Sequence, residues 1–284
     1  MVWNELIACY LFLAGLGAGS FVYASWVGWK APEASKSKIA ALCLAIAAVG
    51  IGTLLLMVDA KAGFQNPLRF FYLLTNWSSV MVWGVALLSA FLIVAFVEFI
   101  IMIKTKKTPK ALDGVGVVLA IGVALYTGLL LGAAPSYPLW NIVVLPLLFL
   151  VSAASTGFAA ARLCSRAAAP SEKGSELLPK KIVAFLPVIE AVLIVALLAV
   201  TALTPGVGAA AGSATITALT VGAFAPAFWV GLWAIGLIIP AVIELYGLKK
   251  EWSAGVAITS EIGILVGGFM LRYLVIMAAV PLVA

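Results

Sequence analysis

Several polar side chains gather near one end of the apolar segments of this chain, where their types suit recognition of a small molecule. Tyr126 presents a hydroxyl from a run otherwise rich in Leu, Gly and Ala, two turns before an uncharged bend at residues 135–138. Asn141 follows that bend and needs a polar partner at this depth. Because Tyr and Trp favour the membrane interface, the bend is expected at a membrane surface, with Tyr126 in one wall of a site.

The outer third of the apolar segments also holds Tyr10, Asp59 and Arg69. A quinone needs a flat apolar slot, a hydrogen-bond donor for each carbonyl and a proton route to water. Tyr126 as donor and Asp59 as proton acceptor meet these needs, with Tyr10 as a second donor. Packing walls are expected from Trp77 and Trp83. In the plainer alternative, Asp59 and Arg69 only pair with each other across the outer loop.

A second set of ionisable residues lies deeper in the apolar segments. Glu190 and Glu261 are predicted at similar depth, and Arg272 follows Glu261 by about 16 Å along one helix. With hydroxyls such as that of Ser152, they form either a proton path or a set of interhelical ties. Glu98 and Glu244 lie nearer the basic loops, and either snorkelling to the surface or pairing with Lys104, Lys249 or Lys250 is the favoured explanation for them.

The composition is that of an integral membrane protein. Of the 284 residues, 65% are hydrophobic and 10% charged, against roughly 25% charged in soluble domains. The net charge of +6 comes from short loops between apolar runs, which favours contact with anionic membrane lipid and excludes nucleic acid as the expected partner.

Histidine is absent from the sequence, and the three cysteines are far apart in it, without a CxxC pair. The usual ligands of haem b and the four thiolates of an iron–sulfur cluster are therefore missing, and no metal site is expected. An electron-handling role would need a diffusible carrier or redox centres held by partner proteins.

Eight apolar segments have the length of about 20 residues that a bilayer crossing requires. They cover approximately residues 5–29, 38–59, 76–103, 113–134, 139–163, 180–203, 219–247 and 254–281. All basic residues except Lys61, Arg69 and Arg272 lie in or beside the connections after the first, third, fifth and seventh segments. By the positive-inside rule, both termini are expected outside the cytoplasm.

An all-α membrane fold with two four-helix bundles is predicted. Residues 1–163 hold the first bundle and the fifth span, a polar linker covers residues 164–180, and residues 181–284 complete the second bundle. The quinone-site residues fall in the first four spans and in the outer segment 59–75. That segment mixes charged and aromatic residues, which suits either an interfacial helix that docks a soluble partner or a simple aromatic belt.

Four sequence stretches resemble the NrfD/PsrC family of polysulfide-reductase membrane subunits. They are LFLAGLGAGSF at 11–21, NPLRFF at 66–71, the hairpin YTGLLL…PLWN…LPLLFLVSAASTG from Tyr126, and GGFMLRYLVIMA at 267–278. The similarity spans the whole chain and keeps its order.

The resemblance implies an eight-helix quinone-reactive anchor that holds no haem and no iron–sulfur cluster of its own. It also implies a ferredoxin-like iron–sulfur subunit and a molybdopterin catalytic subunit on the outer face. In similar proteins the tyrosine of the YTG motif contacts quinone, which here is Tyr126. The family's acidic residue and PxR arginine match Asp59 and Arg69, while some members have a histidine where this chain has Tyr10.

The leading hypothesis is exchange of two electrons and two protons between membrane quinone and an external iron–sulfur subunit. Oxidation of menaquinol at the inner (cell) membrane is the expected direction, and the chain alone is not expected to act on the terminal substrate. One alternative is a proton-translocating subunit that uses Glu190, Glu261 and Arg272. Another is a secondary transporter, which would place its polar contacts at the membrane midplane.

Overall fold

The computed structural model describes residues 4–59, 79–172, 177–206, 208–249 and 252–282, and these residues form helices and connections without a β-strand. The helices are α1 (Glu5–Lys30), α2 (Ser35–Asp59), α5 (Val80–Thr105), α6 (Lys110–Gly132), α7 (Val144–Ala168), α8 (Lys180–Ala202), α9 (Gly208–Thr220), η2 (Ala227–Ile238), α10 (Ile239–Gly247) and α11 (Ala254–Met277). With η2 and α10 taken as one continuous span, eight of these are long and apolar enough to cross a membrane. The predicted all-α, eight-span fold is confirmed.

The seventh span is where the helix boundaries differ most from the prediction. It was expected from residue 219, but Leu219 belongs to the separate short helix α9, and the span starts at Ala227. The amide of Gly222 donates to the carbonyl of Thr217 (2.8 Å) just after α9, and Pro226 stands immediately before η2. Since this whole region is apolar, hydropathy alone did not reveal the break. The stretch η2 is a π-helix that continues into α10 without interruption.

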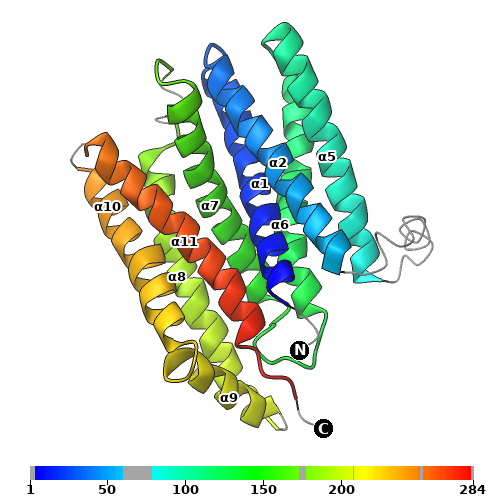
Figure 1. Cartoon of the computed structure of the whole chain (residues 1–284), viewed down its shortest axis with the longest axis vertical. Coiled ribbons are helices and arrows are strands. Elements are labelled where there is room, and N and C mark those ends of the chain that lie inside the picture. Colours follow the sequence, from blue (N-terminus) through cyan, green and yellow to red (C-terminus); the bar gives the residue numbers. More distant parts are fainter. Residues whose placement is uncertain (1–3, 60–78, 173–176, 207, 250–251, 283–284) are drawn as a thin grey trace.

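The helices pack in two groups of four. In the first group, α1 packs against α2 and α6, and α5 packs against the same two helices. The four helices therefore form a ring. The second group is α7, α8, the η2–α10 span and α11. Figure 1 shows α7 at the boundary with the first group. It packs against α1, α2 and α6 of that group as well as against α8 and α11 of its own. The fifth span is therefore a shared wall.

Backbone contact between α1 and α7 makes the seam between the two groups tight. A β-carbon on Gly19 would come within 2.1 Å of the Ala153 carbonyl oxygen, and one on Gly157 within 2.4 Å of the Gly19 Cα. The hydroxyl of Ser20 also donates to the Gly157 carbonyl (3.2 Å). Small residues allow such close approach between membrane helices.

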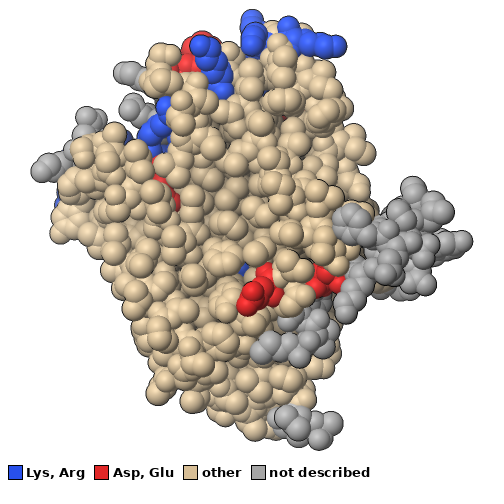
Figure 2. All heavy atoms as spheres, in the orientation of Figure 1, with Lys and Arg blue, Asp and Glu red and all other residues tan. Residues whose placement is uncertain are grey.

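The connections α1–α2, α5–α6, α7–α8 and α10–α11 lie at one end of the molecule, which we call the basic end. Lys and Arg side chains of the described residues gather there, and none is visible at the other end in Figure 2. The first turn of α1 and the last turn of α11 lie at that opposite end (Figure 1). The two ends thus differ in charge as predicted, while the side of the membrane that each faces stays a prediction.

The linker predicted at 164–180 begins later, because α7 continues to Ala168. Its described part also packs on the first group of helices. Glu172 accepts from the backbone amides of Lys36 (3.3 Å) and Ser37 (2.8 Å), and the Trp26 indole donates to the Leu177 carbonyl (3.0 Å). The connection is thereby tied to both ends of the α1–α2 turn.

Candidate functional site

Tyr126 lies inside the first group of helices, on α6 and close to the opposite end. Its side chain is buried, and its ring rests directly on the backbone of Gly84 in α5. A β-carbon built on Gly84 would come within 1.8 Å of the Tyr126 Cζ and 2.0 Å of its hydroxyl oxygen. Glycine at position 84 is therefore what makes room for the phenol. Sequence reasoning missed Gly84, because nothing in the sequence pairs it with Tyr126.

Tyr10 faces the same interior from α1. It is fully buried, and its hydroxyl has no hydrogen-bond partner among the described residues. Tyr10 and Tyr126 belong to the same buried core, and we call them the tyrosine pair. At 1.5 Å per residue, Tyr10 lies about 7.5 Å from the first residue of α1, and Tyr126 about 9 Å from the last residue of α6. Both therefore stand at similar depth below the opposite end.

Asp59 is the last residue of α2 and lies at the same end, partly buried. Its carboxylate accepts a hydrogen bond from the Asn4 side-chain amide (2.6 Å). The side-chain oxygen of Asn4 accepts from the backbone amide of Leu6 (2.9 Å), which caps the start of α1. Asn4 thus connects Asp59 to the helix that carries Tyr10. An Asn immediately before an apolar helix is a capping signal that the sequence does contain.

The remaining residues predicted for the site are Arg69, Trp77, Asn141 and Trp83. Arg69, Trp77 and residues 60–75 of the segment predicted as an interfacial helix lie outside the described residues. Asn141 is in the α6–α7 connection, where its side-chain oxygen accepts from the amides of Val143 and Val144 (both 3.0 Å) and so caps the entry to α7. Trp83, expected as a packing wall, is 53% exposed on the outer surface of α5.

The tyrosine pair suits a small planar carrier with two oxygens. Two phenol donors enter from different helices into a surrounding of Leu, Val and Gly, and one of them is without a partner in the described part of the chain. An unsatisfied buried hydroxyl is costly, so such a group calls for an explanation, which a ligand or an ordered water would supply. These residues therefore fit the hydrogen-bonding demand of a quinone or quinol.

A second polar group lies in the seam between the helix groups. Arg272 of α11 is fully buried, and its guanidinium donates to the Ser152 hydroxyl of α7 (2.7 Å). Ser152 also interacts with Glu190 of α8. A chain of three side chains thus links α8, α7 and α11, and it brings together two of the three residues predicted for a proton path.

Arg272 also reaches the first helix. Its Nε donates to the Leu11 carbonyl (3.3 Å), and its Nη1 to the Gly268 carbonyl (2.8 Å). The guanidinium lies 5.2 Å from the ring centre of Phe149 and fills the space left by Gly15 in α1, where a β-carbon would come within 2.9 Å of Nη2. Because Leu11 follows Tyr10, the last helix is held next to the tyrosine pair.

Glu261, the third residue of the predicted path, belongs to a separate cluster near the basic end. It pairs with Arg162 (3.0 Å) and with Arg166, both from α7. Glu244 lies in the same cluster, 3.5 Å from Arg162, and accepts from Ser260 (3.1 Å). The expectation that Glu244 pairs with Lys249 or Lys250 is therefore corrected to Arg162.

Glu98 also has a different partner from the one predicted. It is fully buried and pairs with Lys38 of α2 at 2.9 Å, instead of with Lys104 at the surface. Lys38 in turn pairs with Asp113 of α6 (2.9 Å). The helix packing explains the correction, because α2, α5 and α6 are neighbours and Lys38 is only 1% exposed between them. The sequence alone suggests that Lys38 belongs to a solvated basic loop.

Comparison with known proteins agrees with these features. The eight apolar helices and the buried polar groups define a multi-pass membrane protein. Residues 1–284 match the model of the family described as polysulphide reductase, NrfD, and the chain belongs to this family. It is 33% identical to the C subunit of the polysulfide reductase of Wolinella succinogenes, with 98% of this chain and 94% of that protein covered. It is also 30% identical to protein NrfD of Escherichia coli, with 98% and 95% covered. This membership supports a membrane subunit of a respiratory oxidoreductase.

Proposed function

We propose that the chain is the quinone-reactive membrane subunit of a respiratory oxidoreductase and that menaquinol is oxidised at the tyrosine pair. The observation that carries this proposal is the buried Tyr10 hydroxyl, which has no partner in the described structure and belongs to the same buried core as Tyr126. The two phenols would each donate to one oxygen of the quinol ring. Their depth of less than about 10 Å from the opposite end leaves a short distance to a redox centre outside the membrane.

The chemistry assigned to the site is proton and electron release. Oxidation of one quinol to quinone releases two protons and two electrons. The electrons pass to the redox centre of a partner protein, since the chain has no histidine and no cysteine cluster to hold its own. Asp59, at the end of α2 and partly exposed, would accept protons and pass them to water at the same surface.

The proposed partners follow from the family and from this geometry. One relative is named as a component of polysulfide reductase, and by analogy a ferredoxin-like iron–sulfur subunit and a molybdopterin catalytic subunit would bind at the opposite end. The protein by itself would not act on the terminal substrate. Its basic end would face the cytoplasm in the inner membrane, so that both termini lie outside.

The proposal is tested by replacing Tyr126 with Phe in the assembled complex. This change removes one hydrogen bond in a buried site, so the rate of menaquinol oxidation should fall about five- to tenfold. Tyr23→Phe is the matched control, because Tyr23 is equally buried in α1 but donates to Ser165 near the basic end. Normal quinol oxidation by Tyr126→Phe in a complex that assembles normally would refute the proposed site.

A second candidate function is proton translocation, which the buried Glu190–Ser152–Arg272 series favours. It is tested by Glu190→Gln in liposomes that contain the whole complex, with protons moved per electron as the readout. If these side chains carry protons, this ratio falls while quinol oxidation continues. Glu261→Gln is the comparison, since Glu261 is held by two arginines. An unchanged ratio in both variants would leave only structural roles for these carboxylates.

A further inference from the structure

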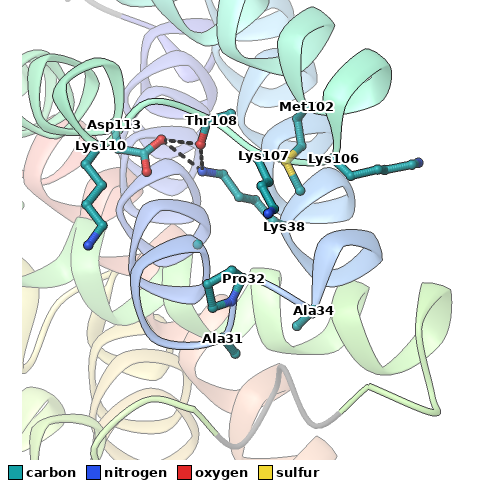
Figure 3. Close-up of a pocket in the computed structure, with 11 residues that line it drawn as sticks. Ala31, Pro32, Ala34, Lys38, Met102, Lys106, Lys107, Thr108, Lys110 and Asp113 are labelled. Atoms are coloured by element: carbon teal, nitrogen blue, oxygen red, sulfur yellow. Dashed lines mark hydrogen bonds and ion pairs between the residues drawn. The ribbon is translucent and has the colours of Figure 1, made fainter.

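A pocket of about 250 Å³ opens at the basic end between the α1–α2 and α5–α6 connections. Four lysines and one aspartate stand among its lining residues, and small apolar side chains make up most of the rest. Figure 3 shows Lys106 and Lys110 extending to either side of the pocket, with Lys107 between them. We call this the basic pocket. Its lining residues are Gly28, Ala31, Pro32, Ala34, Lys38, Met102, Lys106, Lys107, Thr108, Lys110 and Asp113.

The floor of the basic pocket is fixed by Lys38, whose charge is already satisfied. Its ammonium lies 2.9 Å from both Glu98 and Asp113 and 2.5 Å from the Thr108 hydroxyl. Asp113 also accepts from Thr108 (2.8 Å), so that its carboxylate is used within this network. The floor is thereby a rigid polar surface that ties α2, α5 and α6 together. It holds the α5–α6 connection in place above it.

The other three lysines of the basic pocket lie at its rim and carry its remaining positive charge. Lys106, Lys107 and Lys110 are exposed, and none of them forms an ion pair with a carboxylate in the described part of the protein. Lys106 caps the end of α5 in a left-handed conformation (φ 58°), and the connection that begins there carries three lysines within five consecutive residues. The N-terminus of α6, which begins at Lys110 without a side-chain cap, adds the positive end of its dipole.

The basic pocket stands directly above an apolar outer surface. Ile103 of α5 and Val115 of α6 are 48% and 53% exposed, and they lie one to two turns from the lysines. Trp29 of α1, which follows Gly28 of the pocket lining, is 37% exposed. In a membrane-spanning protein this surface meets acyl chains, so the lysines stand at the depth of the phosphate groups.

We propose that the basic pocket binds the phosphate headgroup of an anionic phospholipid from the adjoining leaflet, with its acyl chains on the apolar surface below. The three rim lysines would contact the phosphate, and Pro32, Ala34 and Met102 would contact the glycerol region. Free phosphate shares the charge but has no use for the apolar surface, which is why a lipid is the proposed ligand. The proposal does not depend on the quinone site.

The experiment uses the full-length protein in nanodiscs of phosphatidylcholine with increasing phosphatidylglycerol, and it measures the thermal unfolding midpoint and the lipid retained on purification. Phosphatidylglycerol should raise the midpoint of the wild type. The triple variant Lys106→Gln/Lys107→Gln/Lys110→Gln should need at least about tenfold more phosphatidylglycerol for the same shift. Lys30→Gln/Lys36→Gln/Lys104→Gln removes the same charge from the same end without altering the pocket lining, and should behave like the wild type.

Pro32→Trp provides a test that leaves charge unchanged. The indole would fill the pocket, so phosphatidylglycerol retention should fall although every lysine remains. Equal loss in both triple variants, with normal retention by Pro32→Trp, would mean that only overall charge attracts the lipid and would overturn the proposal. A midpoint shift reproduced by inorganic phosphate alone in phosphatidylcholine nanodiscs would show that a free anion is the ligand, and would overturn the assignment to lipid.

Discussion

The ring of Tyr126 lies against the bare backbone of Gly84, so closely that a β-carbon at position 84 would overlap the ring at 1.8 Å. Gly84→Ala should therefore push the phenol out of its place, at a cost of about 1–3 kcal/mol in stability. Menaquinol oxidation should fall about as much as in Tyr126→Phe, as measured by initial rates in the assembled complex. Gly114→Ala on α6 is the control, because nothing lies within 4 Å of that position. Equal rates for the two glycine variants would show that the Tyr126 position does not matter.

Tyr10→Phe should separate ligand binding from stability. The hydroxyl has no partner among the described residues, so its removal should leave the free energy of unfolding within about 0.5 kcal/mol of the wild type or raise it. The KM for menaquinol should increase about fivefold, because one donor to the quinol is lost. Both values can be measured on one preparation, by thermal unfolding and by quinol titration. A clear loss of stability with an unchanged KM would contradict the proposed role of Tyr10.

Two substitutions of Asn4 should distinguish its two hydrogen bonds. Asn4→Ser keeps an N-cap for α1 but is too short to keep the bond to Asp59, whereas Asn4→Ala loses both. Amide hydrogen exchange of Leu6 and Ile7 should accelerate in Asn4→Ala, with a loss of about 1 kcal/mol, and stay near the wild type in Asn4→Ser. If both variants exchange equally fast, the Asp59 bond and not the cap holds the first turn of α1.

Lys38→Met should be strongly destabilising. It leaves Glu98 and Asp113 buried beside each other without the ammonium between them, and breaking a buried pair in this way costs about 3–5 kcal/mol. Lys104→Met, at the exposed end of α5, should change stability by no more than about 0.5 kcal/mol. Adding Glu98→Met and Asp113→Leu to Lys38→Met should restore much of the loss. Failure of this triple variant to recover would indicate that the polar network is itself required for folding.

The spans were predictable from the sequence because a bilayer crossing imposes one requirement, about 20 apolar residues, that each segment meets by itself. The charge difference between the two ends followed in the same way, from loops considered one at a time. The boundary at Ala227 was not predictable, because α9 and η2 both lie in sequence without a charged residue and only Gly222 and Pro226 mark the break between them. The short α9 helix was missed for the same reason.

The candidate site was predictable only in part. Tyr126 and Tyr10 stood out as polar groups in apolar runs, but their burial in one core depends on how α1 and α6 pack against each other. Lys38 resembles any other member of a solvated basic loop, since the sequence does not reveal that two carboxylates from α5 and α6 meet it below the surface. Ser152 was identified as a hydroxyl donor, yet its position between Arg272 and Glu190 required the packing of three helices.

The glycine contact between α1 and α7 has a consequence for the biosynthesis of this protein. Ser20 of α1 and Gly157 of α7 are hydrogen-bonded although 137 residues separate them in the sequence. The glycine surface of α1 must therefore wait for its partner helix until three more spans have been synthesised. At about 5–20 residues per second, that wait lasts roughly 7–30 s. During this time the glycine surface of the first helix is covered by lipid or by the insertion machinery instead of by α7.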